Sequence, residues 1–293
     1  MQWKRLFAVL ACVVMLAEAG AQIRKIDPTL LGKATAGDAQ AQYLVGQAYL
    51  QGKGVVQDAS QAAAWFQKAA EQGNAQAQYQ AGLLYQAGQG VAQSDTQAAA
   101  WFLKAANQGV AAAQLHLGAL YDHGLGVPQD YAQAAEWYRK AALQENAEAQ
   151  YNLGTLYARG LGVPQDSTQA VDLYRRAATQ GNASAQFNLA LLYDNGEGVD
   201  RDFAEAAKWY NKAADQGVPR AQYNLGSMFV SGQGVPRDLV EAYYWLDLAA
   251  STWDGGRQQE AISARDKVGA RLTAAELFSA QQRAAKWLAA HQK

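Results

Sequence analysis

Apolar residues recur along most of this chain at the spacing of one face of an α-helix, in alternating stripes separated by glycine-rich turns. The first two stripes are Ala41, Val45, Ala48 and Tyr49, and then Ala62, Trp65, Phe66 and Ala69. Each stripe covers only one side of its helix, so each helix needs a neighbour to bury it. The pattern therefore predicts helix–turn–helix units that pack against one another.

The unit repeats with a period of 36 residues. An Ala-x-Ala-Gln motif marks the period, with glutamines at Gln42, Gln78, Gln114, Gln150, Gln186 and Gln222. An aromatic residue, two glycines and a valine follow at fixed distances in every unit, beginning with Tyr49, Gly52, Gly54 and Val55. Because one helix pair cannot bury its apolar face alone, six such units predict a solenoid with a continuous core.

Turn and cap residues separate the predicted helices. The Gly-x-Gly pair ends the first helix of a unit, since glycine adopts positive φ at little cost. A capping-box pattern opens each second helix, at Asp58/Gln61, Ser94/Gln97, Asp130/Gln133, Asp166/Gln169, Asp202/Glu205 and Asp238/Glu241. Asn74, Asn146 and Asn182 are placed to cap the first helix of the next unit.

The two ends of the repeat array differ from the units between them. Residues 22–37 contain half a unit, Pro28 to Ala36, which we expect to cap the first repeat. Six repeats span residues 38–253, and the pattern is expected to end after Trp253. Residues 254–293 then predict two capping helices, about 257–268 and 274–290, the second opened by a Thr273/Glu276 capping box. The predicted fold class is all-α, a right-handed superhelical solenoid of six repeats with a C-terminal helix pair.

The N-terminus has the composition of an export signal. Lys4 and Arg5 precede an apolar run from Leu6 to Ala17, followed by small residues at Ala19 and Ala21. The run is shorter than the roughly 20 residues that span a bilayer. We therefore predict a signal peptide over residues 1–21 and an exported protein, periplasmic or secreted. A lipoprotein signal ending at Cys12 is the alternative.

Composition excludes some partners. Only 17% of the residues are charged and the formal net charge is −1, so the chain has no basic field for nucleic acid. Cys12 is the only cysteine. The mature protein would therefore depend on its core rather than on disulfides for stability.

The repeat unit closely resembles the Sel-one-like repeat (SLR) family, which is related to the tetratricopeptide repeat. Residues 147–178 contain its pattern of Ala, Gln, Gly and aromatic positions, with Leu173 in place of the usual tryptophan and Arg176 in place of lysine. The resemblance implies a non-catalytic scaffold or adaptor that binds another protein. Exported bacterial members are implied to serve in envelope assembly, host interaction or immunity against a secreted effector. Cysteine-rich members described as β-lactam-binding differ from this chain, whose repeats contain no cysteine.

By analogy with tetratricopeptide proteins, the first helix of each unit is expected to line the concave side of the solenoid. Four columns on this helix, beginning at positions 40, 44, 47 and 51, vary between units and share one face. Amides in these columns can both donate and accept hydrogen bonds, which suits a partner's backbone or polar loop. The candidate partner-binding residues are Gln80, His116, Glu148, Asn152, Arg159, Asn188, Asn195, Arg220 and Asn224. The alternative is that these positions are merely solvated.

No residue pattern predicts a catalytic centre, a metal or a cofactor. His116 and His123 are seven residues apart, about 10.5 Å along a helix, which is too far for one tetrahedral ion. The Gly-x-Gly pairs follow helices rather than strands, and Leu173 in the tryptophan column marks that column as core. The chain is therefore predicted not to be an enzyme. A peptidoglycan- or β-lactam-active enzyme is the alternative, and it would need a nucleophile or metal that the sequence does not display.

Overall fold

A computed structural model describes residues 25–291, and this part of the chain folds into fifteen α-helices and no strand. The predicted signal peptide and Cys12 lie outside the described residues.

Six first helices alternate with six second helices, which confirms the predicted solenoid of helix pairs. The first helices are α3 (Ala39–Gln51), α5 (Ala75–Ala87), α7 (Ala111–His123), α9 (Ala147–Arg159), α11 (Ala183–Asn195) and α13 (Pro219–Ser231). The second helices are α4 (Ala59–Glu71), α6 (Asp95–Asn107), α8 (Tyr131–Ala142), α10 (Ser167–Thr179), α12 (Phe203–Asp215) and α14 (Leu239–Thr252). The remaining three are α2 (Pro28–Thr35), α15 (Gly255–Gly269) and α16 (Ala274–His291).

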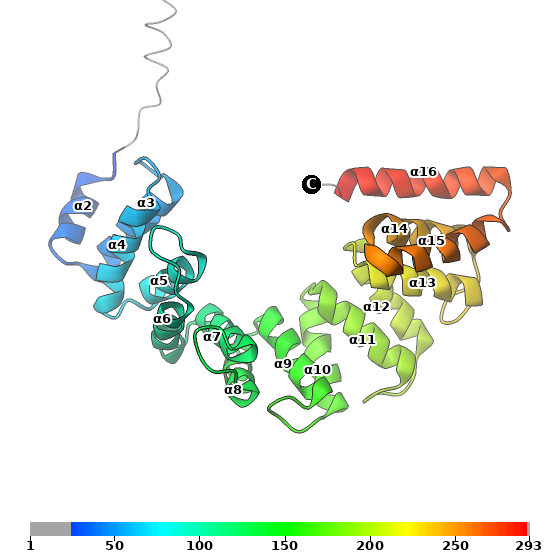
Figure 1. The fold of residues 1–293 in the computed structure, drawn as a ribbon, viewed down its shortest axis with the longest axis horizontal. Coiled ribbons are helices and arrows are strands. Elements are labelled where there is room, and N and C mark those ends of the chain that lie inside the picture. The colour runs from blue at the N-terminus through cyan, green and yellow to red at the C-terminus, as the bar shows by residue number, and fades with distance from the viewer. Residues whose placement is uncertain (1–24, 292–293) are drawn as a thin grey trace, which may run out of the picture. The chain divides into compact units, whose positions relative to one another are not determined.

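The chain divides into two compact units, residues 1–129 and residues 130–293. In unit 1, each helix from α2 to α6 packs on its successor. In unit 2, the same succession runs from α8 to α14, and both α15 and α16 pack on α14. The helices of each unit can be followed in chain order in Figure 1.

The predicted caps of the first helices are confirmed. The side-chain oxygens of Asn74, Asn146 and Asn182 accept hydrogen bonds of 2.8–2.9 Å from the backbone N–H three residues further on. At the other end, Gly52 adopts a left-handed conformation with φ +67°, and the equivalent glycine ends each other first helix in the same way. Local sequence thus fixes both ends of these helices.

The capping boxes predicted for the second helices are incomplete, because only the hydrogen bond to the N-cap side chain forms. Asp202 accepts bonds of 2.9 and 3.0 Å from the N–H groups of Ala204 and Glu205, as predicted. Its own N–H donates to the carbonyl oxygen of Tyr193 at 3.0 Å, so it is not available to the Glu205 side chain. The same backbone bond is made by Asp58, Ser94, Asp166 and Asp238. The turn therefore folds back onto the first helix, and this contact replaces the reciprocal bond of the box.

A buried glutamine joins three successive helices at each repeat junction. Gln186 Nε2 donates to the carbonyl oxygen of Ala178 at 3.1 Å, and Gln186 Oε1 accepts from Gln216 Nε2 at 2.7 Å. Gln186 is only 4% exposed, so these bonds satisfy a polar group that would otherwise be costly to bury. Equivalent pairs of bonds link Gln42 with Gln72, Gln78 with Gln108, and Gln150 with Gln180. The glutamine that marks the period is thus a structural residue, and we call this set of contacts the glutamine seam.

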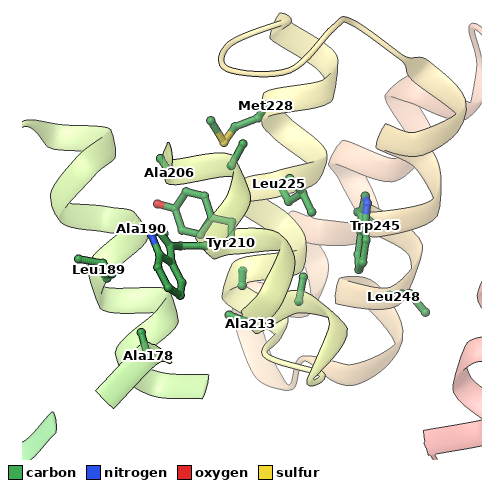
Figure 2. Packing of buried hydrophobic residues seen from close by; sticks show 14 of the residues in the cluster. Ala178, Leu189, Ala190, Ala206, Tyr210, Ala213, Leu225, Met228, Trp245 and Leu248 are labelled. Atoms are coloured by element: carbon green, nitrogen blue, oxygen red, sulfur yellow. The ribbon is translucent and has the colours of Figure 1, made fainter. Parts of the chain in front are cut away.

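Small and aromatic side chains fill the interior between the helices. Figure 2 shows Leu189, Tyr210, Leu225 and Trp245 inside the cluster of buried residues that extends from α10 to α16. The tryptophans predicted to be core are less than one-tenth exposed at Trp101, Trp137, Trp209 and Trp245, while Trp65 is half-buried. A lysine one turn later lies over the ring in four repeats, at 3.9–4.5 Å, so its charge reaches solvent beside a buried indole.

The two C-terminal helices are confirmed, and one contact of the glutamine seam continues into the first of them. Gln258 stands 36 residues after Gln222 and makes the same bond, to the carbonyl oxygen of Ala250 at 3.1 Å. This seam contact therefore extends to α15, although the Ala-x-Ala part of the motif is absent there. Helix α16 departs from the repeat and packs on α14 (Figure 1), and its Thr273 and Glu276 form a complete capping box.

Candidate binding face

In unit 2 the first helices carry half-buried side chains on the side turned away from their apolar stripes. We call this surface the first-helix face. It consists of Tyr151, Asn152 and Thr155 on α9, Phe187, Asn188 and Leu191 on α11, and Tyr223, Asn224 and Ser227 on α13. Each of these helices therefore presents an aromatic side chain, an amide and a third side chain, which is threonine, leucine or serine.

Two of the predicted amides contact tyrosine hydroxyls of the preceding second helix. Asn224 bonds the Tyr210 hydroxyl, which also donates to Asp194 Oδ2 at 3.2 Å. Burial raises the pKa of Tyr210, and the nearby Asp194 carboxylate raises it further. The hydroxyl is thus a proton donor held between an amide and a carboxylate.

The same arrangement occurs one repeat earlier. Asn188 bonds the hydroxyl of Tyr174, which lies 3.1 Å from Thr155 Oγ1. Burial again raises the pKa of this tyrosine. The amides are therefore oriented from beneath by a layer of rings, and only part of each side chain meets solvent.

In unit 1 the predicted residues lie on an apolar ring layer instead. His116 on α7 is half-buried and stacks on Phe102, with ring centroids 5.0 Å apart and an interplanar angle of 21°. Its ring also lies 5.7 Å from that of Tyr79. Gln80 on α5 is half-buried at the equivalent position of the repeat before.

The other four predicted residues are exposed and lie at the ends of the first helices of unit 2. Glu148 and Arg220 lie in the first turns of α9 and α13, and Arg159 ends α9. Asn195 ends α11 and donates to Glu197 Oε1 at 2.9 Å, so it is tied to its own turn. The structure thus brings the amides together with the ring layer, and leaves the charged residues at the margin of the face.

The sequence did not lead us to the aromatic column that follows the motif glutamine in five of the six units, with Leu115 as the exception. Tyr43 lies 5.8 Å from Phe66, and Phe187 lies 5.9 Å from Tyr210, between ring centroids. The column was visible at the 36-residue period, but its side chains are half-buried and belong to no stripe. Glu260 was missed as well: it stands 36 residues after Asn224, and its Oε1 accepts from the Tyr223 hydroxyl at 3.1 Å.

The described residues hold no candidate metal centre, since no three of their His, Cys, Asp or Glu side chains gather in one place. None of the helices in the same range is long and apolar enough to cross a membrane. The chemistry that the face displays is hydrogen bonding and aromatic contact, which are the interactions of a binding surface.

Sequence comparison gives six consecutive matches to the family described as Sel1 repeat. They cover residues 39–74, 75–110, 111–146, 147–182, 183–218 and 219–251. No protein with a curated description matches the chain.

Several solved structures are similar to the chain. A Sel1 repeat protein from Oxalobacter formigenes is 34% identical, over 74% of this chain and 88% of that chain, with a TM-score of 0.67. A protective antigen of uropathogenic Escherichia coli with an SLR fold is 31% identical over 87% of this chain and 69% of that chain, with a TM-score of 0.40. An immunity protein from Pseudomonas aeruginosa is 22% identical over 83% of each chain, with a TM-score of 0.41.

Proposed function

The chain belongs to the Sel1 repeat family, and from this premise we propose that it is a non-catalytic scaffold that holds a protein partner on its first-helix face. The observation that carries the proposal is the mixture of half-buried aromatic and amide side chains on α9, α11 and α13. Aromatic groups supply contact area at protein interfaces, while amides bond a partner's backbone. The tyrosines beneath the amides fix their orientation before the partner arrives, which lowers the entropic cost of binding.

We propose that this role is exercised outside the cytoplasm, most simply in the periplasm. The support is the sequence of the first 21 residues, with two basic residues, an apolar run and small residues after it. Immunity against a secreted, envelope-targeting effector is one form of the role, and it is implied by the family rather than by any single residue. Assembly of an envelope complex is another form of the same binding function.

Charge reversal at the margin of the face tests the proposal. Arg159→Glu with Arg220→Glu changes two exposed side chains that support no core contact. The matched control is Arg176→Glu with Lys286→Glu, which reverses two exposed cations on α10 and α16. The tagged mature chain and both double variants would be used to capture proteins from a periplasmic extract, with mass spectrometry as the readout.

We expect the unmodified chain and the control to retain one specific partner, and the Arg159/Arg220 variant to lose it. Equal recovery by both variants would place the partner elsewhere on the molecule. The same purified chain should leave nitrocefin and cell-wall fragments intact. Turnover of either compound would instead support the enzymatic alternative.

A further inference from the structure

A pocket of about 320 Å³ lies in unit 2 between α13, α14 and α15. Leu246 and Val268 form its floor and are 1% and 4% exposed. Ser227, Val230 and Ala264 form half-buried walls, and Lys267 and Arg271 stand exposed at the mouth. Ser227 also belongs to the first-helix face, so the pocket opens where that face ends.

The pocket exists because one ring is missing. In the five preceding repeats an aromatic side chain stands at the position of Leu246, namely Phe66, Phe102, Tyr138, Tyr174 and Tyr210. The wall differs too: Val230 stands where Asp194 bonds the Tyr210 hydroxyl one repeat earlier. Leucine and valine are smaller and apolar, so the space that a ring fills elsewhere is left open and lined with hydrocarbon.

Two cations at the mouth have no partner of their own. Within residues 25–291, Lys267 and Arg271 make neither an ion pair nor a side-chain hydrogen bond. The neighbouring carboxylates of Asp247 and Asp266 are both engaged by Arg265, at 3.1 and 2.8 Å. An anion at the mouth would therefore meet two available positive charges above an apolar cavity.

We propose that this pocket binds the C-terminal residue of a peptide, with its apolar side chain against Leu246 and its carboxylate between Lys267 and Arg271. The volume is at the lower end of the range of ligand pockets, which suits a single residue rather than a long chain. The assignment to a peptide rests on the proposed function, because the pocket continues the first-helix face and a partner segment lying on that face would end here.

Fluorescence anisotropy with defined peptides tests the assignment on the full mature chain. The probe is a fluorescein-labelled pentapeptide, Gly-Ser-Gly-Ser-Leu, with a free C-terminal carboxylate. Its C-terminal amide is the matched probe that lacks the charge. We expect the carboxylate to bind at least tenfold more tightly than the amide, and equal affinity would overturn the proposal.

Variants separate the two parts of the pocket. Lys267→Gln with Arg271→Gln should reduce the carboxylate preference to less than threefold, whereas Lys286→Gln with Arg237→Gln should leave it unchanged. Leu246→Phe restores the ring of the other repeats and should abolish binding of both probes. Ala264→Leu fills the pocket from the opposite wall and serves if the phenylalanine variant fails to fold by circular dichroism. Unchanged binding in a folded pocket-filling variant would overturn the site.

Two further outcomes distinguish a failure of the pocket assignment from a failure of the proposed binding function. Octanoate that binds while the peptide does not would show a carboxylate site of another kind and overturn the peptide assignment. The Arg159→Glu, Arg220→Glu variant should still bind the peptide, because both residues lie outside the pocket. If that variant loses partner capture but the unmodified chain binds no peptide, the peptide site is overturned and the proposed function of the first-helix face stands.

Discussion

The two units use one repeat scaffold but place different rings beneath their first helices. In unit 1 the ring is Phe66 or Phe102, which has no hydroxyl, and Phe102 stacks on the half-buried His116. In unit 2 the ring is Tyr138, Tyr174 or Tyr210, and the hydroxyls of Tyr174 and Tyr210 bond groups on the first helices on either side.

The glutamine seam, in contrast, is present in both units. Gln78 in unit 1 and Gln186 in unit 2 bond the equivalent carbonyl oxygen at 3.0 and 3.1 Å. The contrast indicates that the seam holds the repeats together and that the ring layer adapts the surface above it. Substitutions in the seam and turns should therefore act alike in both units, and substitutions in the ring layer should not.

The largest effect is expected at the second glycine of the turns. A Cβ on Gly90 would lie 2.2 Å from the Ala59 carbonyl oxygen, and one on Gly198 would lie 2.4 Å from the Ser167 carbonyl carbon. Both glycines also have positive φ, of +76° and +70°. Gly90→Ala and Gly198→Ala should each lower the free energy of unfolding by about 3 kcal/mol or more, because backbone overlap adds to the strain of the left-handed conformation.

Urea unfolding followed by circular dichroism measures the loss, and hydrogen exchange assigns it to a unit. Gly109→Ala and Gly181→Ala are the controls, since their φ values are also positive but no atom lies within 4 Å of the added methyl group. These controls should lose only about 1–2 kcal/mol. A clear difference between Gly90→Ala and Gly198→Ala would contradict the view that one scaffold serves both units.

The seam should give the next largest effect. Gln78→Met and Gln186→Met keep the volume of the side chain but remove its amide, and with it two seam bonds: the one to the buried carbonyl oxygen and the one from Gln108 or Gln216. The carbonyl oxygen and the second glutamine each keep one further hydrogen bond, to the turn glycine. Each substitution should cost about 2 kcal/mol, since two hydrogen bonds of about 1 kcal/mol each are lost. Gln169→Met changes an exposed glutamine and should be nearly neutral. Equal losses of protection in the two units, measured by hydrogen exchange, are the expected result.

The sequence was sufficient for the repeat, its helices and most of its caps, because each depends on residues close together along the chain. The period marked by Gln42 and its successors located every helix pair, yet the role of the glutamine was not visible, because its partners are a carbonyl eight residues back and a side chain 30 residues on. The capping boxes are incomplete for a similar reason, because the N–H of Asp202 donates to the carbonyl oxygen of Tyr193, nine residues earlier in the chain.

The candidate face was predicted less completely than the fold. Variable columns identified Asn188 and Asn224, but nothing in their own columns indicated the tyrosine hydroxyls that lie beneath them. The pocket at Leu246 could not be predicted from the sequence either. A leucine at a position that is aromatic in the other repeats looks like an ordinary core residue. A cavity forms where neighbouring side chains leave space unfilled, and that space can be identified only once the helices are packed against one another.

The ring layer gives a prediction that applies to unit 2 alone. Tyr210→Phe removes the bonds to Asp194 and Asn224 and should cost about 1 kcal/mol at neutral pH. Burial raises the pKa of Tyr174 and Tyr210, so their neutral form stabilises the native state. This contribution is fully present below about pH 10, the ordinary tyrosine pKa, and is lost as the pH rises through the native value.

Urea unfolding at pH 8 and at pH 10.5 measures this dependence. The unmodified chain should lose more stability between the two pH values than the Tyr174→Phe, Tyr210→Phe double variant. Tyr131→Phe is the control, a tyrosine that stands in no ring-layer position. An identical alkaline loss in the chain and the double variant would show that the buried hydroxyls do not distinguish unit 2 from unit 1.

The smallest effect is a gain in stability, at a turn of unit 2 where glutamate replaces the glycine found in unit 1. Gly73 and Gly109 end second helices of unit 1 with positive φ, whereas Glu145 takes the equivalent place at φ +59°. Its carboxylate accepts from Gln150 Nε2 at 3.0 Å, and the seam bond from Gln150 to the Ala142 carbonyl is 3.3 Å, compared with 3.0–3.1 Å at the other junctions. Glu145→Gly removes the strain of a side chain in the left-handed region, and it allows the seam bond from Gln150 to the Ala142 carbonyl to shorten.

We expect Glu145→Gly to raise the free energy of unfolding by about 0.5–1 kcal/mol in urea titrations, the balance between about 1 kcal/mol of relieved strain and a partly exposed hydrogen bond. Glu145→Ala keeps the strained Cβ and loses the carboxylate, so it should be less stable than the unmodified chain. A gain for alanine as large as that for glycine would assign the effect to the carboxylate. The turn at residue 145 would then differ from those of unit 1 in its charge and not in its backbone.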